Sequence, residues 1–405
     1  MTRRLEQRLP LEVYVLQVGL VLNAFGNGVA NPFILLYLHD VRHIPLAEAG
    51  LASAANAGAA LVASLVGGSL ADRVGPKATV LGGLALATAT FLVYPTVTTT
   101  WQAIVVGALL GTAAGGWLTG QSALLAALVP RAKRHVAFAQ QRVAANVGLG
   151  LGGLTGGLIA STRDASTFTT LFVVNAATFA AYGLFIARLR VARAPVVVGT
   201  TPLRYRAVAR DRVLLRVLAI DIAVVAGAVA LLNGLFPVYA RNEADATESV
   251  IGALFLANSL LVIGAQLPIA RAVEGHRRAY ALALMATLFS ICWLLTLGAQ
   301  VGGVALLLAA VVVLSFGECI YDSVRTPLIA DLAPDGLGGR YLAAAGFSWQ
   351  LGFIVGPAAG AVLLGARPAA LWIAAATVCA IAALAALRLD ARLPQEVRET
   401  AVRGA

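Results

Sequence analysis

Residues 67–77 read GGSLADRVGPK and form a short basic segment between two long apolar runs. Gly75 allows a tight turn between two helices. Arg73 and Lys77 favour the cytoplasmic side of a membrane, and Asp72 can face the positive end of a neighbouring helix. The simpler alternative is an ordinary glycine turn with solvated charges. The sequence on either side of the segment distinguishes the two interpretations.

The composition is that of a polytopic membrane protein. Of the 405 residues, 60% are hydrophobic and 12% are charged, whereas soluble domains are about 45–50% apolar and about 25% charged. Low-charge runs of membrane-spanning length, about 20 residues, recur along the chain. The first run is too long for a signal peptide, and further spans follow it. We place twelve spans, near 12–38, 46–70, 78–95, 102–128, 138–160, 168–187, 213–240, 249–270, 279–299, 303–329, 341–365 and 368–388.

The distribution of basic residues gives these spans an orientation. Of the 30 Lys and Arg, 26 lie at the termini or in and beside every second loop, and the other four are Arg42, Arg163, Arg241 and Arg367. Because loops rich in Lys and Arg stay in the cytoplasm, we expect both termini to be cytoplasmic. The net charge of +11 then needs no nucleic-acid partner. The low Lys and high Arg, Ala and Gly usage suggests a bacterial inner membrane.

The chain divides into two similar halves. We interpret residues 188–212 as a cytoplasmic linker between six-span bundles at 1–187 and 213–405, because this interior stretch is strongly charged. Since each half contains six spans, the repeat is parallel, an arrangement that encloses a site near the membrane midplane. Four weak matches recur 200 to 206 residues apart: Asn27-Gly28 with Asn233-Gly234, Gly50 and Asn56 with Gly252 and Asn258, Gly75 with Gly275, and Gly148 and Gly152 with Gly352 and Gly356.

The basic segment resembles the signature loop between helices 2 and 3 of the major facilitator superfamily. The family pattern G-x-x-x-D-R-x-G-R-R/K is matched at Gly68, Asp72, Arg73, Gly75 and Lys77, with Pro76 at a usually basic position. The resemblance extends over nearly the whole chain. It implies an all-α membrane transporter of twelve helices in two pseudo-symmetric six-helix bundles, with this hairpin gating the cytoplasmic side.

Span 5 resembles a signature of the antiporters of that family. Its glycines, which follow G-x-x-x-G-P-x-x-G-G except for Gly153 at the proline position, are Gly148, Gly152, Gly156 and Gly157. Span 11 keeps the proline, in Gly356-Pro357-x-x-Gly360. Glycines four apart form a smooth strip for close helix packing, and the resemblance implies that the strip seals the outer side of drug exporters. Plain Gly/Ala packing is the alternative.

One departure limits the resemblance. In span 4, Gly107 stands where the family motif places an Arg four residues before a Gly. A proton relay through that Arg is therefore not transferred to this chain.

Carboxylates inside the spans are the candidates for proton coupling, because ionisable groups in the bilayer are costly. Glu318 lies near mid-depth in span 10, with Asp322 and Arg325 following at helical spacing. We expect Arg325 to neutralise Asp322, while desolvation and a like charge favour the protonated form of Glu318. A Glu hydrogen-bonded to a neighbouring helix is the alternative. Asp221 in span 7 is a further proton-coupling candidate, or else a partner of Arg216.

Polar and aromatic side chains within spans are the candidates for a substrate cavity. Asn23, Asn27 and Asn31 recur at four-residue steps and share one face of span 1. Amides can equally join helices, and deep tryptophans can equally be packing rather than walls for a cationic ligand. Arg142, at the start of span 5, is expected to be structural or gating. The remaining candidates are Asn56, Trp117, Gln121, Asn233, Asn258, Trp349 and Gln350.

No metal or cofactor is predicted. His39 and His43 lack further spaced ligands, and the three cysteines fall inside spans. The sequence contains no H-E-x-x-H, G-x-S-x-G or P-loop motif, which disfavours an intramembrane enzyme or an ATP-driven pump.

We expect a monomeric multidrug antiporter that uses the proton gradient to export amphipathic or drug-like molecules, with antibiotic resistance as the outcome. An uptake symporter or uniporter is the alternative, and a non-transporting receptor a remote one.

Overall fold

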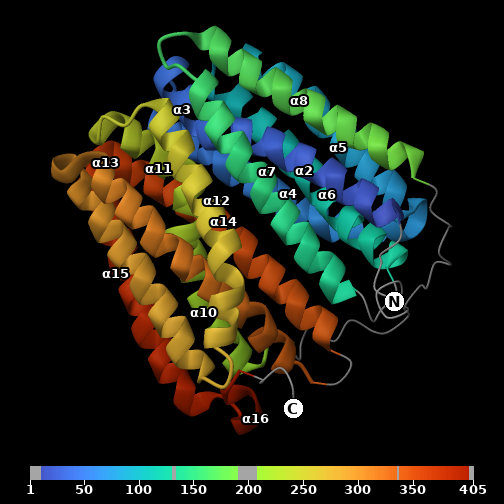
Figure 1. Cartoon of the computed structure of the whole chain (residues 1–405), viewed down its shortest axis with the longest axis vertical. Helices are drawn as coiled ribbons and strands as arrows, with labels where there is room; N and C mark the ends of the chain where they lie inside the picture. The colour runs from blue at the N-terminus through green and yellow to red at the C-terminus, as the bar shows by residue number, and fades with distance from the viewer. Residues whose placement is uncertain (1–10, 130–133, 190–207, 335–336, 401–405) are drawn as a thin grey trace, which may run out of the picture. The chain divides into compact units, whose positions relative to one another are not determined.

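The computed structural model describes residues 11–129, 134–189, 208–334 and 337–400, and Figure 1 shows that long helices make up most of them. Every regular element in these residues is helical, and the only extended pairing among them is an isolated bridge between Arg277 and Glu399. The predicted all-α membrane fold is confirmed.

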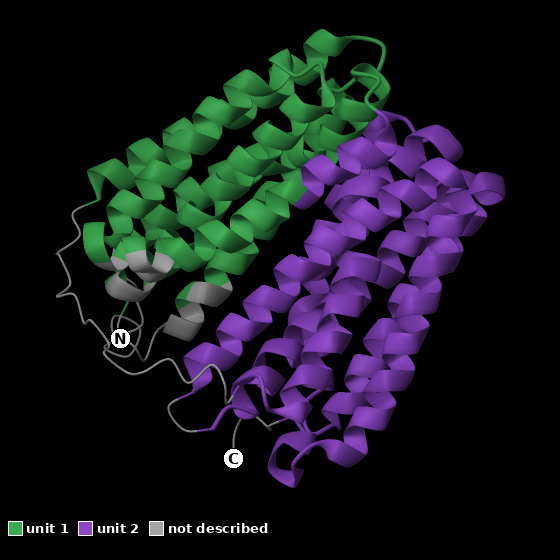
Figure 2. Ribbon diagram, turned by 180° about the vertical axis from the view of Figure 1, so that it is seen from behind, with its two compact units in different colours: residues 1–44, 55–200 green, residues 45–54, 201–405 purple. Residues whose placement is uncertain are grey.

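The chain forms two compact units, coloured separately in Figure 2. Unit 1 contains residues 1–44 and 55–200, and unit 2 contains residues 45–54 and 201–405. Helix α4 contributes its first turns to unit 2 and the rest of its length to unit 1.

Unit 1 is built from helices that match the first six predicted spans. Their bounds are α2 Leu11–Ala30, η1 Asn31–Phe33, α3 Ile34–Leu36, η2 Tyr37–Val41, α4 Leu46–Val74, α5 Pro76–Val93, η3 Tyr94–Thr96, α6 Thr100–Leu128, α7 Arg134–Ile159 and α8 Ala165–Arg188. Helix α2 packs along α7, and α5 packs between α6 and α8. A buried aromatic cluster joins η2, η3 and α8, where the ring centroids of Tyr94 and Phe172 lie 4.7 Å apart and those of Tyr37 and Phe172 lie 5.0 Å apart.

Unit 2 repeats this organisation. Its elements are α10 Arg212–Val224, η5 Val225–Val229, α11 Ala230–Glu243, α12 Glu248–Ala272, α13 Arg278–Asp331, α14 Gly338–Ala366, α15 Pro368–Leu389, η6 Asp390–Arg392 and α16 Gln395–Arg398. Predicted spans 9 and 10 both lie in α13, which is interrupted at Gly303 by a positive φ of 61°. This backbone conformation is open to glycine and costly for other residues.

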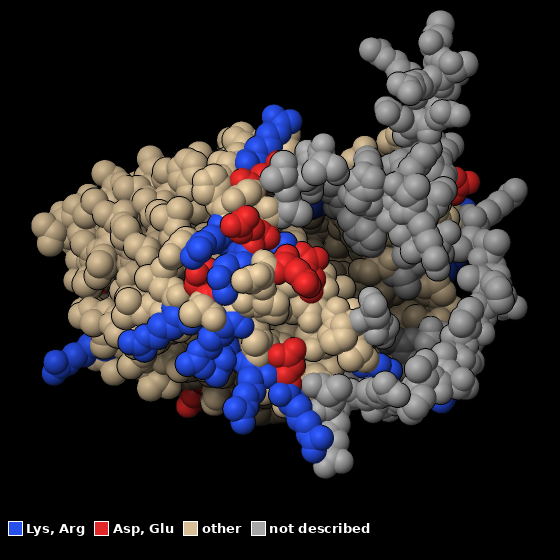
Figure 3. Space-filling model, turned by 90° about the horizontal axis from the view of Figure 1, so that it is seen from below, with Lys and Arg blue, Asp and Glu red and all other residues tan. Residues whose placement is uncertain are grey.

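Ten described helices are long and apolar enough to cross a membrane, and α13 among them contains two of the predicted spans. Helix α7 corresponds to the remaining predicted span. Predicted span ends lie within four residues of the observed helix ends. The chain is therefore a multi-pass membrane protein. Charged side chains of both signs gather on the face shown in Figure 3.

Two of the four sequence matches between the halves have the same structural role in each unit. A Cβ on Gly152 would lie 2.0 Å from the Phe25 carbonyl oxygen of α2, and a Cβ on Gly356 would lie 2.6 Å from the Ala226 carbonyl oxygen of η5. Span 5 thus packs on span 1 as span 11 packs on span 7. Gly75 and Gly275 both have positive φ, 92° and 72°, in equivalent turns. At these two matches the sequence repeat corresponds to a structural repeat.

Candidate functional site

A buried carboxylate in unit 2 holds three helices together. Asp221 of α10 is 4% exposed and accepts hydrogen bonds on both carboxylate oxygens. Arg325 of α13 donates from Nε to Oδ1 at 2.6 Å and from Nη2 to Oδ2 at 2.8 Å. The hydroxyl of Tyr321 donates to Oδ1 at 2.7 Å, and that of Ser348 in α14 donates to Oδ2 at 2.5 Å. This bidentate, charge-assisted arrangement is the strongest form of carboxylate binding by side chains.

The guanidinium of Arg325 is enclosed on its remaining sides. Its Nη2 also donates to the Ala345 carbonyl at 2.6 Å, and its Cζ lies 5.5 Å and 5.6 Å from the ring centroids of Tyr321 and Trp349. Aromatic faces of this kind attract a cation. Arg325 therefore pairs with Asp221 of another helix, whereas the spacing in the sequence suggests Asp322. The proposed alternative partner of Asp221, Arg216, lies instead in a groove between α10 and α15.

The backbone beside this cluster departs from α-helical geometry. Residues Val225–Val229 form a π-helix directly after α10, and such turns leave the regular hydrogen-bond ladder and are frequent at functional sites. The carbonyl of Gly227 in this turn accepts a hydrogen bond from Trp293 Nε1 at 2.6 Å. The indole thereby fixes the turn that follows Asp221.

Glu318 lies one turn of α13 away from this cluster and has an amide partner. Asn258 of α12 donates from Nδ2 to Glu318 Oε2 at 2.8 Å and lies 3.0 Å from Ser315 Oγ. Further along the same two helices, Gln266 donates to Ser323 Oγ at 3.1 Å. Glu318 is half-buried, and neutral polar contacts join α12 and α13 around it. Of the predicted cavity amides, Asn258 is thus brought into contact with a predicted proton-coupling residue.

The three asparagines of span 1 bind one another. Asn27 donates to Asn23 Oδ1 at 3.3 Å, and Asn31 donates to Asn27 Oδ1 at 3.4 Å. Asn23 is 2% exposed, and its Nδ2 has no partner among the described residues. The predicted single-face stripe is present as a hydrogen-bonded ladder, and its buried end retains one unused donor.

The remaining cavity candidates lie in different surroundings. Gln121 is 2% exposed, and its Oε1 has no partner in the described part of the chain. Asn233 is exposed and donates to the carbonyl of Val229, the last residue of η5, at 3.1 Å. Asn56 and Gln350 are half-buried. These four residues are not brought together by any hydrogen bond seen among the described residues.

The two deep tryptophans have different neighbours. Trp117 packs on Phe179 in unit 1, with ring centroids 4.6 Å apart, and belongs to that unit's aromatic core. Trp349 packs on Phe353 at 5.3 Å and faces Arg325. Of the two, Trp349 is the one that contributes to the charged cluster.

The basic hairpin is held by contacts to α8. Lys77 Nζ donates to the carbonyls of Ala187 and Leu189 at 2.8 and 2.7 Å, so its charge lies at the negative end of α8. Arg73 is exposed. Gly68 and Asp72 lie in α4, and the contacts predicted for these two residues are outside the described part of the structure.

The predicted gating residues of span 5 separate into two kinds. Arg142 is exposed, and its carbonyl accepts a hydrogen bond from Asn146. Gly148, Gly152 and Gly156 each leave room for the backbone of α2. The glycine strip is thus an interface within unit 1.

The sequence did not predict that the hydroxyl groups of Tyr321 and Ser348 donate hydrogen bonds to Asp221. Tyr321 directly precedes Asp322, and its apolar ring gave no signal that its hydroxyl reaches another helix. Ser348 precedes the conspicuous Trp349-Gln350 pair. In both cases the missing information was the rotation of each helix about its own axis.

These features define a multi-pass membrane protein with a polar, charged interior, as expected of a solute transporter. The chain belongs to the Major Facilitator Superfamily, whose family model matches residues 16–245 and 218–404.

Two relatives are transporters of Bacillus subtilis (strain 168). The uncharacterised MFS-type transporter YqjV is 25% identical over 355 residues, which is 86% of this chain and 85% of that protein. The uncharacterised MFS-type transporter YttB is 25% identical over 365 residues, covering 88% of this chain and 89% of that protein.

Solved transporter structures share the fold. The nucleoside transporter NupG has a TM-score of 0.73 at 13% identity, covering 94% of this chain and 99% of that chain. A D-xylose-proton symporter has a TM-score of 0.75 at 15% identity, covering 96% of this chain and 98% of that chain. At these identities the likeness shows the fold alone. The protein is a transporter of the MFS type and not an enzyme.

Proposed function

We propose that this transporter couples the export of small amphipathic or drug-like molecules to proton entry by alternating access, as a monomer without a cofactor. It would reside in a bacterial inner membrane with both termini cytoplasmic. The two six-helix units would expose a midplane site to each side in turn.

The observation that carries the proton coupling is the position of Glu318. It is a half-buried carboxylate in the middle of a membrane span, and Asn258, a neutral amide, donates to it at 2.8 Å. A carboxylate at membrane depth is costly to keep ionised, and protonation removes that cost. Proton uptake and release at Glu318 is the change of state that such a site makes possible.

The Asp221–Arg325 pair supports a different role. Four side-chain donor contacts, two of them from a guanidinium, hold both oxygens of the Asp221 carboxylate. We propose that this cluster holds spans 7, 10 and 11 in one arrangement and that its geometry changes with the transport cycle. Asp322 and Asp221 remain second-rank candidates for carrying the proton.

The direction and the substrate class are inferred from two further features. The resemblance of the span 5 glycines to the antiporter signature favours export. Carboxylates and the aromatic face of Trp349 in unit 2 favour cationic, amphipathic solutes.

The test is gradient-driven flux in proteoliposomes with Glu318→Gln, a variant that keeps an acceptor for Asn258 but cannot titrate. We expect lipophilic cations to accumulate in vesicles with an acidic lumen when the cytoplasmic face is outside. In the variant, gradient-driven flux should fall to background, while exchange of labelled for unlabelled substrate at equal pH persists.

The matched control is Glu274→Gln, which removes a carboxylate from the turn after α12 and should leave flux unchanged. Gradient-driven flux that is unaltered in Glu318→Gln would exclude Glu318 as the coupling group. Accumulation only with the opposite gradient would replace export by uptake symport.

A further inference from the structure

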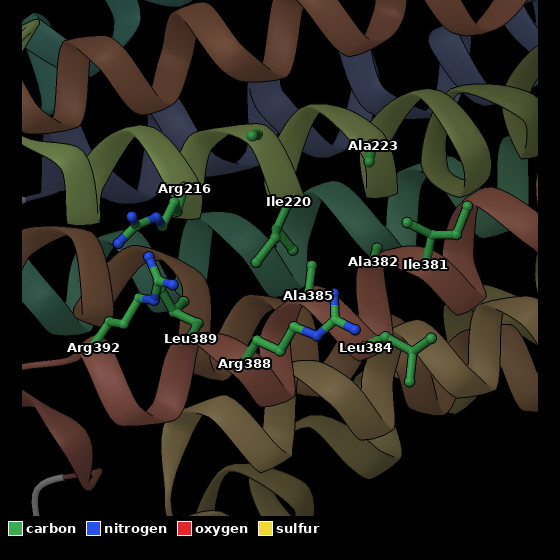
Figure 4. Close-up of a pocket in the computed structure, with 11 residues that line it drawn as sticks. Arg216, Ile220, Ala223, Ile381, Ala382, Leu384, Ala385, Arg388, Leu389 and Arg392 are labelled. Carbon is green, nitrogen blue, oxygen red and sulfur yellow. The ribbon is translucent and has the colours of Figure 1, made fainter.

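A groove of about 560 Å³ lies between α10 and α15 in unit 2 (Figure 4). Three arginines line one part of it: Arg216 from α10, Arg388 from α15 and Arg392 from η6. The remainder is aliphatic, with Ile220 and Leu384 among its lining side chains. The groove therefore has a cationic part and an apolar part.

The arginines of the groove are not neutralised by the protein. Within the described residues, none of their guanidiniums makes a hydrogen bond or ion pair. The acidic residues on the same elements have other partners. Asp211 caps α10 at 2.9 Å, Asp221 binds the guanidinium inside the unit, and Asp390 pairs with Arg277 at 2.8 Å.

Two of the three arginines face each other. Figure 4 shows the guanidiniums of Arg216 and Arg392 turned toward each other, whereas the guanidinium of Arg388 points away from them, on the side of Leu384. The like charges of Arg216 and Arg392 repel, and an anion between them would relieve this repulsion.

The apolar part extends into the membrane from the charged part. Ala223 and Ile381 are each seven residues further into their helices than Arg216 and Arg388. At a rise of 1.5 Å per residue, this places them roughly 10 Å deeper. The charged part lies within the first turns of α10 and at the end of α15, where a span meets the membrane interface.

We propose that the groove binds one anionic phospholipid, with its phosphate between Arg216 and Arg392 and an acyl chain along the aliphatic side chains. Basic pockets between membrane helices attract anionic head groups, and guanidiniums bind phosphate in a bidentate manner. A soluble anion would use the arginines but not the apolar part. The bound lipid would bridge spans 7 and 12, and the proposal is independent of the substrate, the direction and the proton coupling of transport.

The experiment measures lipid binding to the purified full chain in detergent by native mass spectrometry. Phosphatidylglycerol and phosphatidylcholine with identical chains are compared. The test variant is Arg216→Gln with Arg392→Gln, and the control is Arg188→Gln with Arg271→Gln, which removes two exposed arginines at other helix ends. We expect phosphatidylglycerol to be preferred, and its affinity to fall about 25-fold in the test variant, at about fivefold per arginine. The control should change it less than twofold.

A second variant tests the apolar part without changing the charge. Ala385 is half-buried and lines the groove, so Ala385→Trp should weaken phosphatidylglycerol binding. Equal affinity for the two lipids, or equal losses in the test and control variants, would overturn the proposal. So would glycerol phosphate competing as strongly as the whole lipid, because the site would then recognise a soluble anion.

Discussion

Asp221 and Arg325 form an ion pair in which each charge depends on the other. The side chains are 2% and 15% exposed, so neither is solvated by water to a useful extent. Losing one partner of a buried pair leaves an uncompensated charge, which costs more than the pair itself contributes. The cluster is therefore sensitive to single substitutions and tolerant of a matched double one.

At this scale we predict that Asp221→Asn destabilises the protein by about 3–5 kcal/mol. The amide keeps a shape that Tyr321 and Ser348 can contact, but it leaves the charge of Arg325 without its counter-ion. Combining Asp221→Leu with Arg325→Met should recover most of the loss, because the site then holds no charge.

The measurement is thermal unfolding in detergent with a thiol-reactive dye, since Cys292, Cys319 and Cys379 are all buried and react only on unfolding. Asp245→Asn, in an exposed loop, is the control and should not move the midpoint. A single variant as stable as the double one would mean that the pair is not electrostatically coupled.

At the scale of helices, close approach depends on glycines whose hydrogen atoms face another backbone. Gly152 and Gly28 face each other across α7 and α2, and a Cβ on Gly28 would lie 2.3 Å from the Leu149 carbonyl oxygen. Real Cβ atoms do not approach that closely, so the two helices would have to separate. In a membrane, where the hydrophobic effect does not drive helix association, such packing is a main source of stability.

We predict opposite effects for two Gly→Ala substitutions in unit 1. In Gly152→Ala the new Cβ would lie 2.0 Å from the Phe25 carbonyl oxygen, and overpacking of this kind costs about 1–3 kcal/mol. In Gly183→Ala, on α8, nothing lies within 4 Å of the new Cβ, so better helix propensity should stabilise by up to about 1 kcal/mol. The same dye assay measures both, and a lowered midpoint for Gly183→Ala would contradict the packing argument.

The helices were predictable from the sequence, but the rotation of each helix about its own axis, which decides the side chains that meet a neighbouring helix, was not. Predicted span 168–187 is observed as Ala165–Arg188, and 249–270 as Glu248–Ala272, because hydropathy and charge are local properties. The partner of Asp221 is 104 positions away in the sequence, and a span that is apolar all round does not reveal which face meets which neighbour. The π-helix after α10 likewise has no local sequence signal that we recognised.

At the scale of the whole molecule, the distribution of charge predicts the orientation in the membrane. The side predicted to be cytoplasmic carries 26 basic residues and the other side carries four, and each additional Lys or Arg in a short loop opposes its translocation. In a vesicle, the orientation of the chain relative to the proton gradient decides whether a measured flux corresponds to export or to import. The topology therefore has to be known before the direction of flux can be interpreted.

We predict that Arg163→Cys and Arg367→Cys react with a membrane-impermeant maleimide in intact cells, whereas Arg188→Cys and His276→Cys react only after permeabilisation. All four side chains are exposed at helix ends or in turns, and the three native cysteines are buried, so background labelling should be low. Arg163 and Arg367 are two of the four basic residues on the side predicted to be external, whereas Arg188 and His276 lie beside loops predicted to be cytoplasmic.

Labelling in the reverse pattern would mean that the protein has the opposite orientation in the membrane, and the direction of flux in the vesicle experiments would then be reversed. Labelling of all four in intact cells would instead show that the loops are not separated by the bilayer, which contradicts the assignment of α8 as a span between Arg163 and Arg188.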